Sequence, residues 1–208
     1  IELEGVADKY KNKICIVGNI LRKEIINSSP VINKNKNILK ILILGGSQAA
    51  KIFAEKLPTI LKYCCNANIP IRIYQQCLPD QNKFLTSFYK DLNIDFKIFN
   101  FTNNILEYFS LANLAITRSG SSMLAELTNC KIPFISVPLP TSADNHQLKN
   151  AIYYKKKGYS YLIEEKDLST KLFKLIKLLH EDKLLLDKIK RKQAEHSDKS
   201  VFNNIDKE

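Results

Sequence analysis

The residues best able to do chemistry lie in one stretch, 115–126, which reads AITRSGSSMLAE. An apolar run ends in a polar turn around Gly120, and a segment with helical spacing follows that carries Glu126. This pattern predicts a strand, a turn and a helix N-terminus, whose first N–H groups lack helical partners and attract anions. A carboxylate about one and a half turns into such a helix can bind a ribose diol. The stretch therefore indicates a nucleotide site, although serine and glycine also cap ordinary helices. Arg118 is expected to pair with a carboxylate or to support the turn.

Two further polar turns follow apolar segments. The run 38–44 leads into Gly45-Gly46-Ser47, and the run 134–137 leads into a turn-rich segment ahead of Asn145-His146-Gln147. Ser47 stands at the predicted start of a helix, where its hydroxyl either caps the helix or binds a phosphate oxygen. Each turn alone is compatible with a simple helix cap, but three such turns after three strands favour a shared binding edge.

Apolar runs and helical stripes alternate along the whole chain. Strands are predicted at 14–18, 38–44, 69–75, 94–99, 113–117, 134–137 and 159–163, and helices at 49–64, 81–91, 103–110, 121–129, 145–157 and 168–190. Residues 27–37 are predicted to form a loop, and Gly158 is predicted to end its helix. The alternation predicts an α/β fold with a Rossmann-like, doubly wound parallel sheet. Ligands of such sheets bind at the carboxyl ends of the strands, near the switch in strand order.

The composition is that of a globular domain with a strong positive charge. Apolar residues make up 45% of the chain, the net charge is +11 and the pI is near 9.3. No apolar run approaches the roughly 18 residues of a membrane span. The charge suits a phosphate-rich partner such as a nucleotide or an anionic membrane surface, or it reflects lysines spread over solvated faces. Because no basic stripe with interleaved aromatic residues occurs, nucleic acid is not expected as a partner.

The cysteine and histidine residues show no ligand pattern. The five cysteines include no CxxC pair, and the three histidines are scattered. An odd cysteine count, in a sequence that shows no secretory signal, indicates free thiols in a reducing compartment, and no metal site is predicted.

Four motifs together resemble a known family. They are VGNILR at 17–22, LGGSQAA at 44–50, TRSGSSMLAE at 117–126 and VPLPTSADNHQLKNA at 137–151. In this order and at these separations they are similar to the C-terminal half of the MurG family of peptidoglycan glycosyltransferases. Members of that family transfer N-acetylglucosamine from UDP-N-acetylglucosamine (UDP-GlcNAc) to the lipid-linked acceptor lipid I, giving lipid II.

The resemblance implies a division of the chain and a set of ligands. Residues 1–25 would be the last strand and exit of an N-terminal acceptor domain, 26–190 the donor-binding domain of a GT-B glycosyltransferase, and 191–208 a polar C-terminal tail. Arg22 and Ser47 would contact the donor diphosphate, and Thr102 would offer backbone groups to the uracil. The helix-terminal amides expected at the α-phosphate belong to Ser121, Ser122, Met123, Leu124 and Ala125.

The remaining donor contacts implied by the resemblance are polar side chains. Glu126 would bind the ribose hydroxyls, and Gln147, with Asn150, would bind the sugar hydroxyls. Enzymes of this kind are inverting and need no metal or other cofactor, because helix amides and Arg22 stabilise the departing UDP. No catalytic residue is expected in this chain, since the general base belongs to the N-terminal domain of the family.

These implications lead to an expected role and to alternatives. We expect a donor-binding half that acts peripherally at the cytoplasmic face of the bacterial inner membrane and that does not transfer sugar by itself. Lysines at 155–157 and in the last helix would add to attraction by anionic lipids. The first alternative is the soluble donor-binding subunit of a split transferase, which an apolar surface along 14–26 would favour. The second is a non-catalytic nucleotide-sugar-binding domain.

Overall fold

The computed structural model describes residues 10, 13, 18–27, 37–46 and 51–195, and strands and helices alternate along them as the sequence predicts. The elements in chain order are α2 (Lys23–Ile26), β1 (Leu39–Leu44), α3 (Lys51–Asn66), β2 (Ile71–Gln76), η1 (Pro79–Gln81), α4 (Asn82–Asp91), β3 (Asp95–Phe99), α5 (Ile105–Leu111), β4 (Leu114–Thr117), α6 (Ser121–Asn129), β5 (Phe134–Ser136), η2 (Ala143–Asn145), α7 (His146–Lys156), β6 (Ser160–Leu162), η3 (Glu165–Asp167), α8 (Leu168–Glu181) and α9 (Leu184–Ala194).

The strands form one parallel sheet with a switch in strand order. The order is β3-β2-β1-β4-β5-β6, and every neighbouring pair is parallel. The chain builds outward from β1 to β3 and then returns to the other side of β1 with β4. This confirms the doubly wound sheet and places the switch between β1 and β4, which is where such sheets bind ligands.

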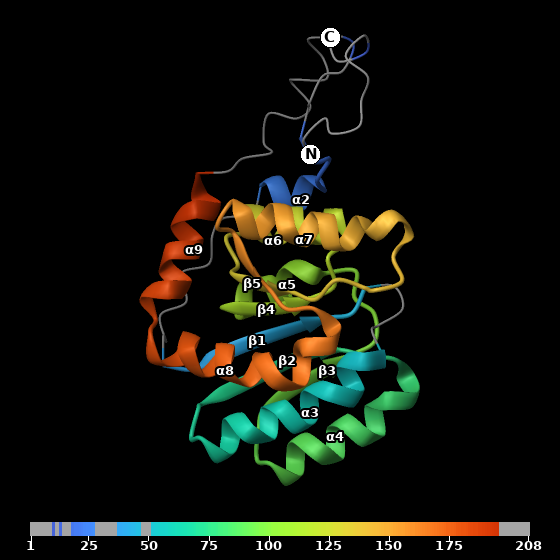
Figure 1. Ribbon diagram of the computed structural model, residues 1–208. Coiled ribbons are helices and arrows are strands. Elements are labelled where there is room, and N and C mark those ends of the chain that lie inside the picture. Colours follow the sequence, from blue (N-terminus) through green and yellow to red (C-terminus); the bar gives the residue numbers. More distant parts are fainter. Residues whose placement is uncertain (1–9, 11–12, 14–17, 28–36, 47–50, 196–208) are drawn as a thin grey trace.

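Helices cover both faces of the sheet, with α3, α4 and α8 on one face and α5, α6 and α7 on the other (Figure 1). The central strand β1 supplies both cores, since Leu39, Ile41 and Ile43 belong to the first and Leu42 and Leu44 to the second. Burial on both faces explains why this strand reads as a continuous apolar run.

The short helix α2 packs on the second face, against α6. Leu21 and Ile25 are buried and pack in one core cluster with residues of α5, α6 and α7, whereas Ile20 is 68% exposed. The domain therefore covers much of the described part of the apolar segment 14–26 with its own residues. The strand predicted at 14–18 and the loop at 27–37 lie almost wholly outside the described residues.

The long helix predicted at 168–190 is wrong, because the chain forms two helices. Helix α8 ends at Glu181, and Asp182 has extended backbone angles (φ −112°, ψ 91°). The Asp182 carboxylate accepts a hydrogen bond from Leu184 N at 3.0 Å, which starts α9 in a new direction. Helix α9 packs against α6 and runs to Ala194. There Gln193 is fully buried, and its Nε2 donates to the carbonyls of Ile132 (3.0 Å) and Tyr159 (2.9 Å).

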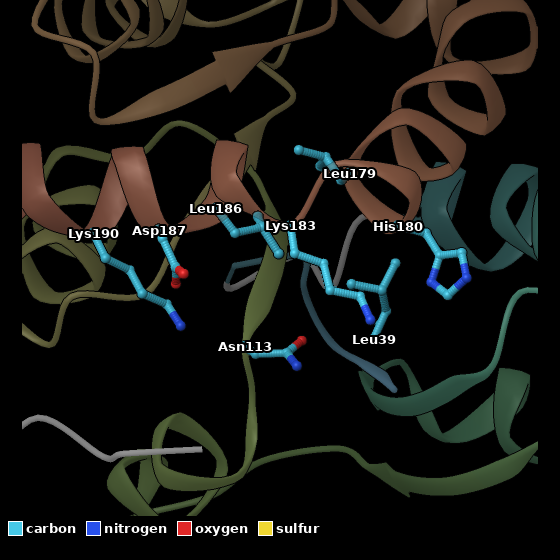
Figure 2. Close-up of a pocket in the computed structure, with 8 residues that line it drawn as sticks. All are labelled: Leu39, Asn113, Leu179, His180, Lys183, Leu186, Asp187 and Lys190. Atoms are coloured by element: carbon cyan, nitrogen blue, oxygen red, sulfur yellow. The ribbon is translucent and has the colours of Figure 1, made fainter. Parts of the chain in front are cut away.

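A small pocket lies at the amino ends of β1 and β4 (Figure 2). Its volume of about 30 Å³ has room for roughly two water molecules. Asn113 lines it, and its side chain accepts from Lys40 N (2.8 Å) and donates to Ile38 O (2.8 Å). Lys183, the N-cap residue of α9, donates to Asn37 Oδ1 at 2.7 Å. These bonds hold the strands and α9 together, so this edge of the sheet has a structural role.

We predict that Gln193→Ala lowers the free energy of unfolding by about 1–3 kcal/mol, because two main-chain carbonyls lose their buried donor. Urea unfolding measures the change. Arg191→Ala, at an exposed position of α9, is the control and should stay within about 0.5 kcal/mol of the wild type. Equal, negligible effects of both substitutions would mean that the end of α9 is frayed.

Candidate functional site

Three loops meet at the carboxyl edge of the sheet, as the sequence predicts. Leu44 of β1 lies opposite Thr117 of β4, which lies opposite Ser136 of β5, so the three strands end at one level. Gly46, after β1, has φ +74°, a conformation that favours glycine, and a Cβ there would meet no atom of the described residues within 4 Å. The backbone at this turn is thus open to a ligand. Ser47, with its predicted phosphate contact, lies outside the described residues.

The N-terminus of α6 has the geometry that favours an anion. Its N-cap residue is Gly120, no side chain caps the helix, and the first turn contains no acidic residue. Leu124 N–H already bonds to Gly120 O at 3.1 Å, so the amides ahead of it are those of Ser121, Ser122 and Met123. The sequence also predicts that Leu124 and Ala125 offer amides to the α-phosphate, and the structure buries both residues in the core.

Ser119 precedes this helix and is completely buried, and its hydroxyl has no hydrogen-bond partner among the described residues. Its main chain, in contrast, is held by two side chains of α7. Gln147 Oε1 accepts from Ser119 N at 3.1 Å and from Leu139 N at 3.1 Å. Asn150 Nδ2 donates to Ser119 O at 3.0 Å. The two residues predicted to bind the sugar therefore lie at this edge and contact the turn before α6.

The start of α7 is a strained segment. Asp144 and Asn145 both have left-handed backbone angles, with φ of 49° and 54°. Such angles are unfavourable for residues other than glycine, though asparagine and aspartate tolerate them best, and they cluster at functional sites. The two residues turn the chain so that α7 begins with His146, which is exposed, and Gln147.

Glu126 and Arg22 form a bidentate ion pair. Arg22 Nε donates to Glu126 Oε1 at 2.9 Å, and Nη2 donates to Oε2 at 2.8 Å, across 104 residues of sequence. The carboxylate is largely buried, with 9% of its side chain exposed, whereas 48% of the Arg22 side chain is exposed. The hydrogen bonds raise the pKa of the guanidinium. Sequence reasoning placed both residues at the site but missed that they bind each other.

Arg118 lies beneath the site and supports its turn, as predicted. The side chain is 11% exposed, and Nη2 lies 2.5 Å from the Glu165 carboxylate. Nη1 donates to the carbonyls of Val137 (3.3 Å) and Pro138 (3.2 Å), and the guanidinium lies 5.2 Å from the centre of the Phe53 ring. One buried cation thus links the ends of β4 and β5 to α3 and η3.

The loop after β3 holds Thr102, whose Oγ1 accepts from Asn104 N at 3.0 Å. A pair of amides anchors this loop: Asn100 Nδ2 donates to Asn82 Oδ1 (2.9 Å), and Asn82 Nδ2 donates to Asn100 Oδ1 (3.2 Å). Phe101, between Asn100 and Thr102 in the chain, is 78% exposed. Sequence reasoning missed the pairing of Asn82 with Asn100, since nothing in their spacing marks them as partners.

The thiols of Cys64 and Cys77 are buried in the protein. The cysteines that the structure describes are free, as expected. Burial raises the pKa of Cys77 to about 11 and that of Cys64 to about 12. Within 18–27, 37–46 and 51–195, no group of three or more His, Cys, Asp or Glu side chains could hold a metal ion.

The sequence matches the Glycosyltransferase family 28 C-terminal domain over residues 40–205, and the chain belongs to this family. Two similar proteins are each named UDP-N-acetylglucosamine–N-acetylmuramyl-(pentapeptide) pyrophosphoryl-undecaprenol N-acetylglucosamine transferase. The one from Pelagibacter ubique is 35% identical over 95% of this chain and 55% of its own length. The one from Rickettsia canadensis is 34% identical over 93% of this chain and 57% of its own length.

A solved structure gives the same assignment. The crystal structure of Acinetobacter baumannii MurG is 26% identical and superposes with a TM-score of 0.73, covering 85% of this chain and 54% of MurG. The chain thus corresponds to the C-terminal half of MurG and spans just over half the length of the curated relatives it matches. The predicted family and fold are confirmed.

We predict that Arg118→Met lowers the free energy of unfolding by about 3–5 kcal/mol, because Glu165 and two carbonyls lose a buried partner. Lys171→Met, which breaks an exposed ion pair with Asp167, is the control and should cost less than about 1 kcal/mol. Urea unfolding compares the two. Equal costs would show that the Arg118 contacts contribute no more than a surface pair.

Proposed function

We propose that this chain is the donor-binding half of a MurG-like glycosyltransferase that uses UDP-GlcNAc. The observation that carries the proposal is the uncapped N-terminus of α6 at the strand-order switch, with Glu126 further along the same helix. Membership of the family and the names of the relatives support the donor and a role in peptidoglycan synthesis.

The proposed contacts follow the geometry of the carboxyl edge. The amides of Ser121, Ser122 and Met123 would bind the α-phosphate, and the main chain at Thr102 would bind the uracil. Gln147 and Asn150 lie at the same edge, on α7, where they would meet the sugar. Ser47, which follows the open turn at Gly46, would contact the diphosphate.

Arg22 and Glu126 would exchange partners when the donor binds. In the structure both oxygens of the Glu126 carboxylate accept hydrogen bonds from Arg22. The ribose hydroxyls must therefore share these oxygens with Arg22 or displace it. The half-exposed guanidinium of Arg22 would then move to the diphosphate. The diphosphate would replace Glu126 as the anionic partner of Arg22. The ribose hydroxyls would keep the largely buried Glu126 carboxylate hydrogen-bonded.

The reaction would be an inverting displacement without a metal ion. A hydroxyl of lipid I attacks C1 of N-acetylglucosamine, the bond from C1 to the β-phosphate oxygen breaks, and a general base of the N-terminal half takes the proton. The negative charge that develops on UDP would be stabilised by the α6 amides and Arg22. This chain would supply the donor site, and the acceptor half would supply the general base. We therefore expect no sugar transfer from this chain alone.

We predict that the chain binds UDP-GlcNAc in preference to UDP-glucose and ATP, and that Glu126→Ala weakens UDP-GlcNAc binding at least about tenfold, because the ribose loses a charged acceptor. Isothermal titration calorimetry measures each dissociation constant. Glu181→Ala, which removes an exposed carboxylate on the opposite face of the sheet, should leave binding unchanged.

Each other outcome of the titrations has a definite meaning. Binding of all three nucleotides with equal strength would contradict the proposed donor, and an unchanged affinity in Glu126→Ala would contradict the ribose contact. Transfer to lipid I after a cognate N-terminal half is added would separate an enzyme half from a non-catalytic binding domain.

We also propose a peripheral position at the cytoplasmic face of the inner membrane. The lysines at 155–157, at the C-terminal end of the site-forming α7, are exposed, and each lysine near an anionic surface contributes about 1 kcal/mol of attraction. No helix in the part of the chain that the structure describes is both long enough and apolar enough to cross a bilayer.

We predict that replacing the lysines at 155–157 by glutamine lowers the association constant for phosphatidylglycerol vesicles about 100-fold in cosedimentation, since about 1 kcal/mol of attraction is lost per lysine. The matched control replaces Lys56, Lys62 and Lys174, which are exposed on the opposite face of the sheet. Equal cosedimentation with phosphatidylglycerol and phosphatidylcholine vesicles would contradict the proposed attraction.

A further inference from the structure

We propose that Gln147 and Asn150 are positioning residues that hold the phosphate-binding turn in place, beyond any contact with the sugar. The proposal rests on the proposed function, in that the α6 N-terminus is where UDP binds. Both side chains come from α7, and both bond to the main chain of Ser119, the residue just before the helix N-cap.

The acceptor of Gln147 is already fully used. Its Oε1 receives Ser119 N–H and Leu139 N–H, each at 3.1 Å, which occupies both lone pairs of the carbonyl oxygen. The two N–H groups also fix which end of the amide faces the turn, because an NH₂ group there would oppose two donors. Only Nε2 is left, so Gln147 can offer a donor, and no acceptor, to a sugar oxygen.

Asn150 uses the opposite end of its amide. Its Nδ2 donates to Ser119 O at 3.0 Å. Gln147 and Asn150 therefore satisfy the N–H and the C=O of the same residue, one from each side. Ser119 is completely buried, and no other main-chain bond of Ser119 to the described residues accompanies these two. A buried peptide group without partners is costly, so these side chains determine where the turn can lie.

The position of this turn sets the direction of the α6 amides. Gly120 follows Ser119 and begins the helix without a capping side chain, so the Leu124 N–H bond to Gly120 O holds the first turn without help from any capping residue. If the two amide side chains are removed, the first N–H groups of α6 are no longer held in the direction of the phosphate. Gln147 and Asn150 should then matter for UDP, which carries no sugar, as much as for UDP-GlcNAc.

Gln147 binds Ser119 through its amide oxygen and Asn150 through its amide NH₂ group, and this difference allows a matched experiment. Gln147→Glu keeps an oxygen acceptor for both N–H groups, whereas Asn150→Asp places an acceptor against the Ser119 carbonyl. Both changes add one negative charge to the same helix, so repulsion of the diphosphate is similar. We expect the dissociation constant for UDP to be at least about tenfold higher in Asn150→Asp than in Gln147→Glu.

Two further variants complete the experiment. Gln147→Leu removes the acceptor without adding charge and should weaken UDP binding about tenfold, with faster hydrogen exchange at the Ser119 and Leu139 amides. Gln147→Glu should keep both amides protected. Ile152→Ala, at an exposed position of α7, is the control and should bind UDP as the wild type does. Isothermal titration calorimetry and amide exchange by NMR supply the readouts.

The inference fails if Gln147→Glu and Asn150→Asp bind UDP equally well, or if Gln147→Leu weakens UDP-GlcNAc binding but leaves UDP binding unchanged. A fall in thermal stability with unchanged UDP affinity would also overturn it, because that is the signature of a purely structural role. If the wild type itself binds no UDP, the proposed function fails first, and that result is distinct from all of these.

Discussion

The site depends on one buried residue, Ser119, whose main-chain N–H and C=O have their hydrogen-bond partners on another helix. Because α6 has no side-chain cap, the direction of its first amides depends on Gln147 and Asn150 across the loop. Arg118 fixes the same turn from below, through the carbonyls at the end of β5 and the Glu165 carboxylate. The binding edge is thus organised from β4, β5, α7 and η3 together, and no single element could form it.

The second constraint is electrostatic. Glu126 is a largely buried carboxylate, and such a group needs a charged or hydrogen-bonding partner in every state of the protein. Arg22 supplies that partner from the segment that leads into α2, which is itself anchored by Leu21 and Ile25 in the core. In our account a nucleotide ribose takes over this role, so donor binding and the position of Arg22 are linked.

Local sequence signals predicted much of this architecture. The helix at 121–129 has the predicted bounds, and Gly158 ends α7 with φ +75° as expected, because a glycine after helical spacing is a local signal. The break at Asp182 was missed, since leucine spacing continues through it and the new direction of α9 depends on packing against α6.

The candidate site was predictable in its location but not in its contacts. The three turns follow strands that are each visible in the sequence, so their meeting at one edge follows from the parallel sheet. The pairing of Arg22 with Glu126 and the use of opposite amide ends by Gln147 and Asn150 depend on side-chain orientation in three dimensions. No spacing rule encodes such orientation.

The most direct measurement of the central claim is an NMR titration with UDP that follows the Nε–H signals of the four arginines together with the α6 amides. The signal of Arg22 is assigned with Arg22→Lys. Our account predicts that the amides of Ser121, Ser122 and Met123 shift on binding and that the Arg22 signal moves with them as its bond to Glu126 is exchanged. If the α6 amides shift while the Arg22 signal stays fixed, the exchange is contradicted; if the α6 amides do not respond, UDP does not bind at this helix.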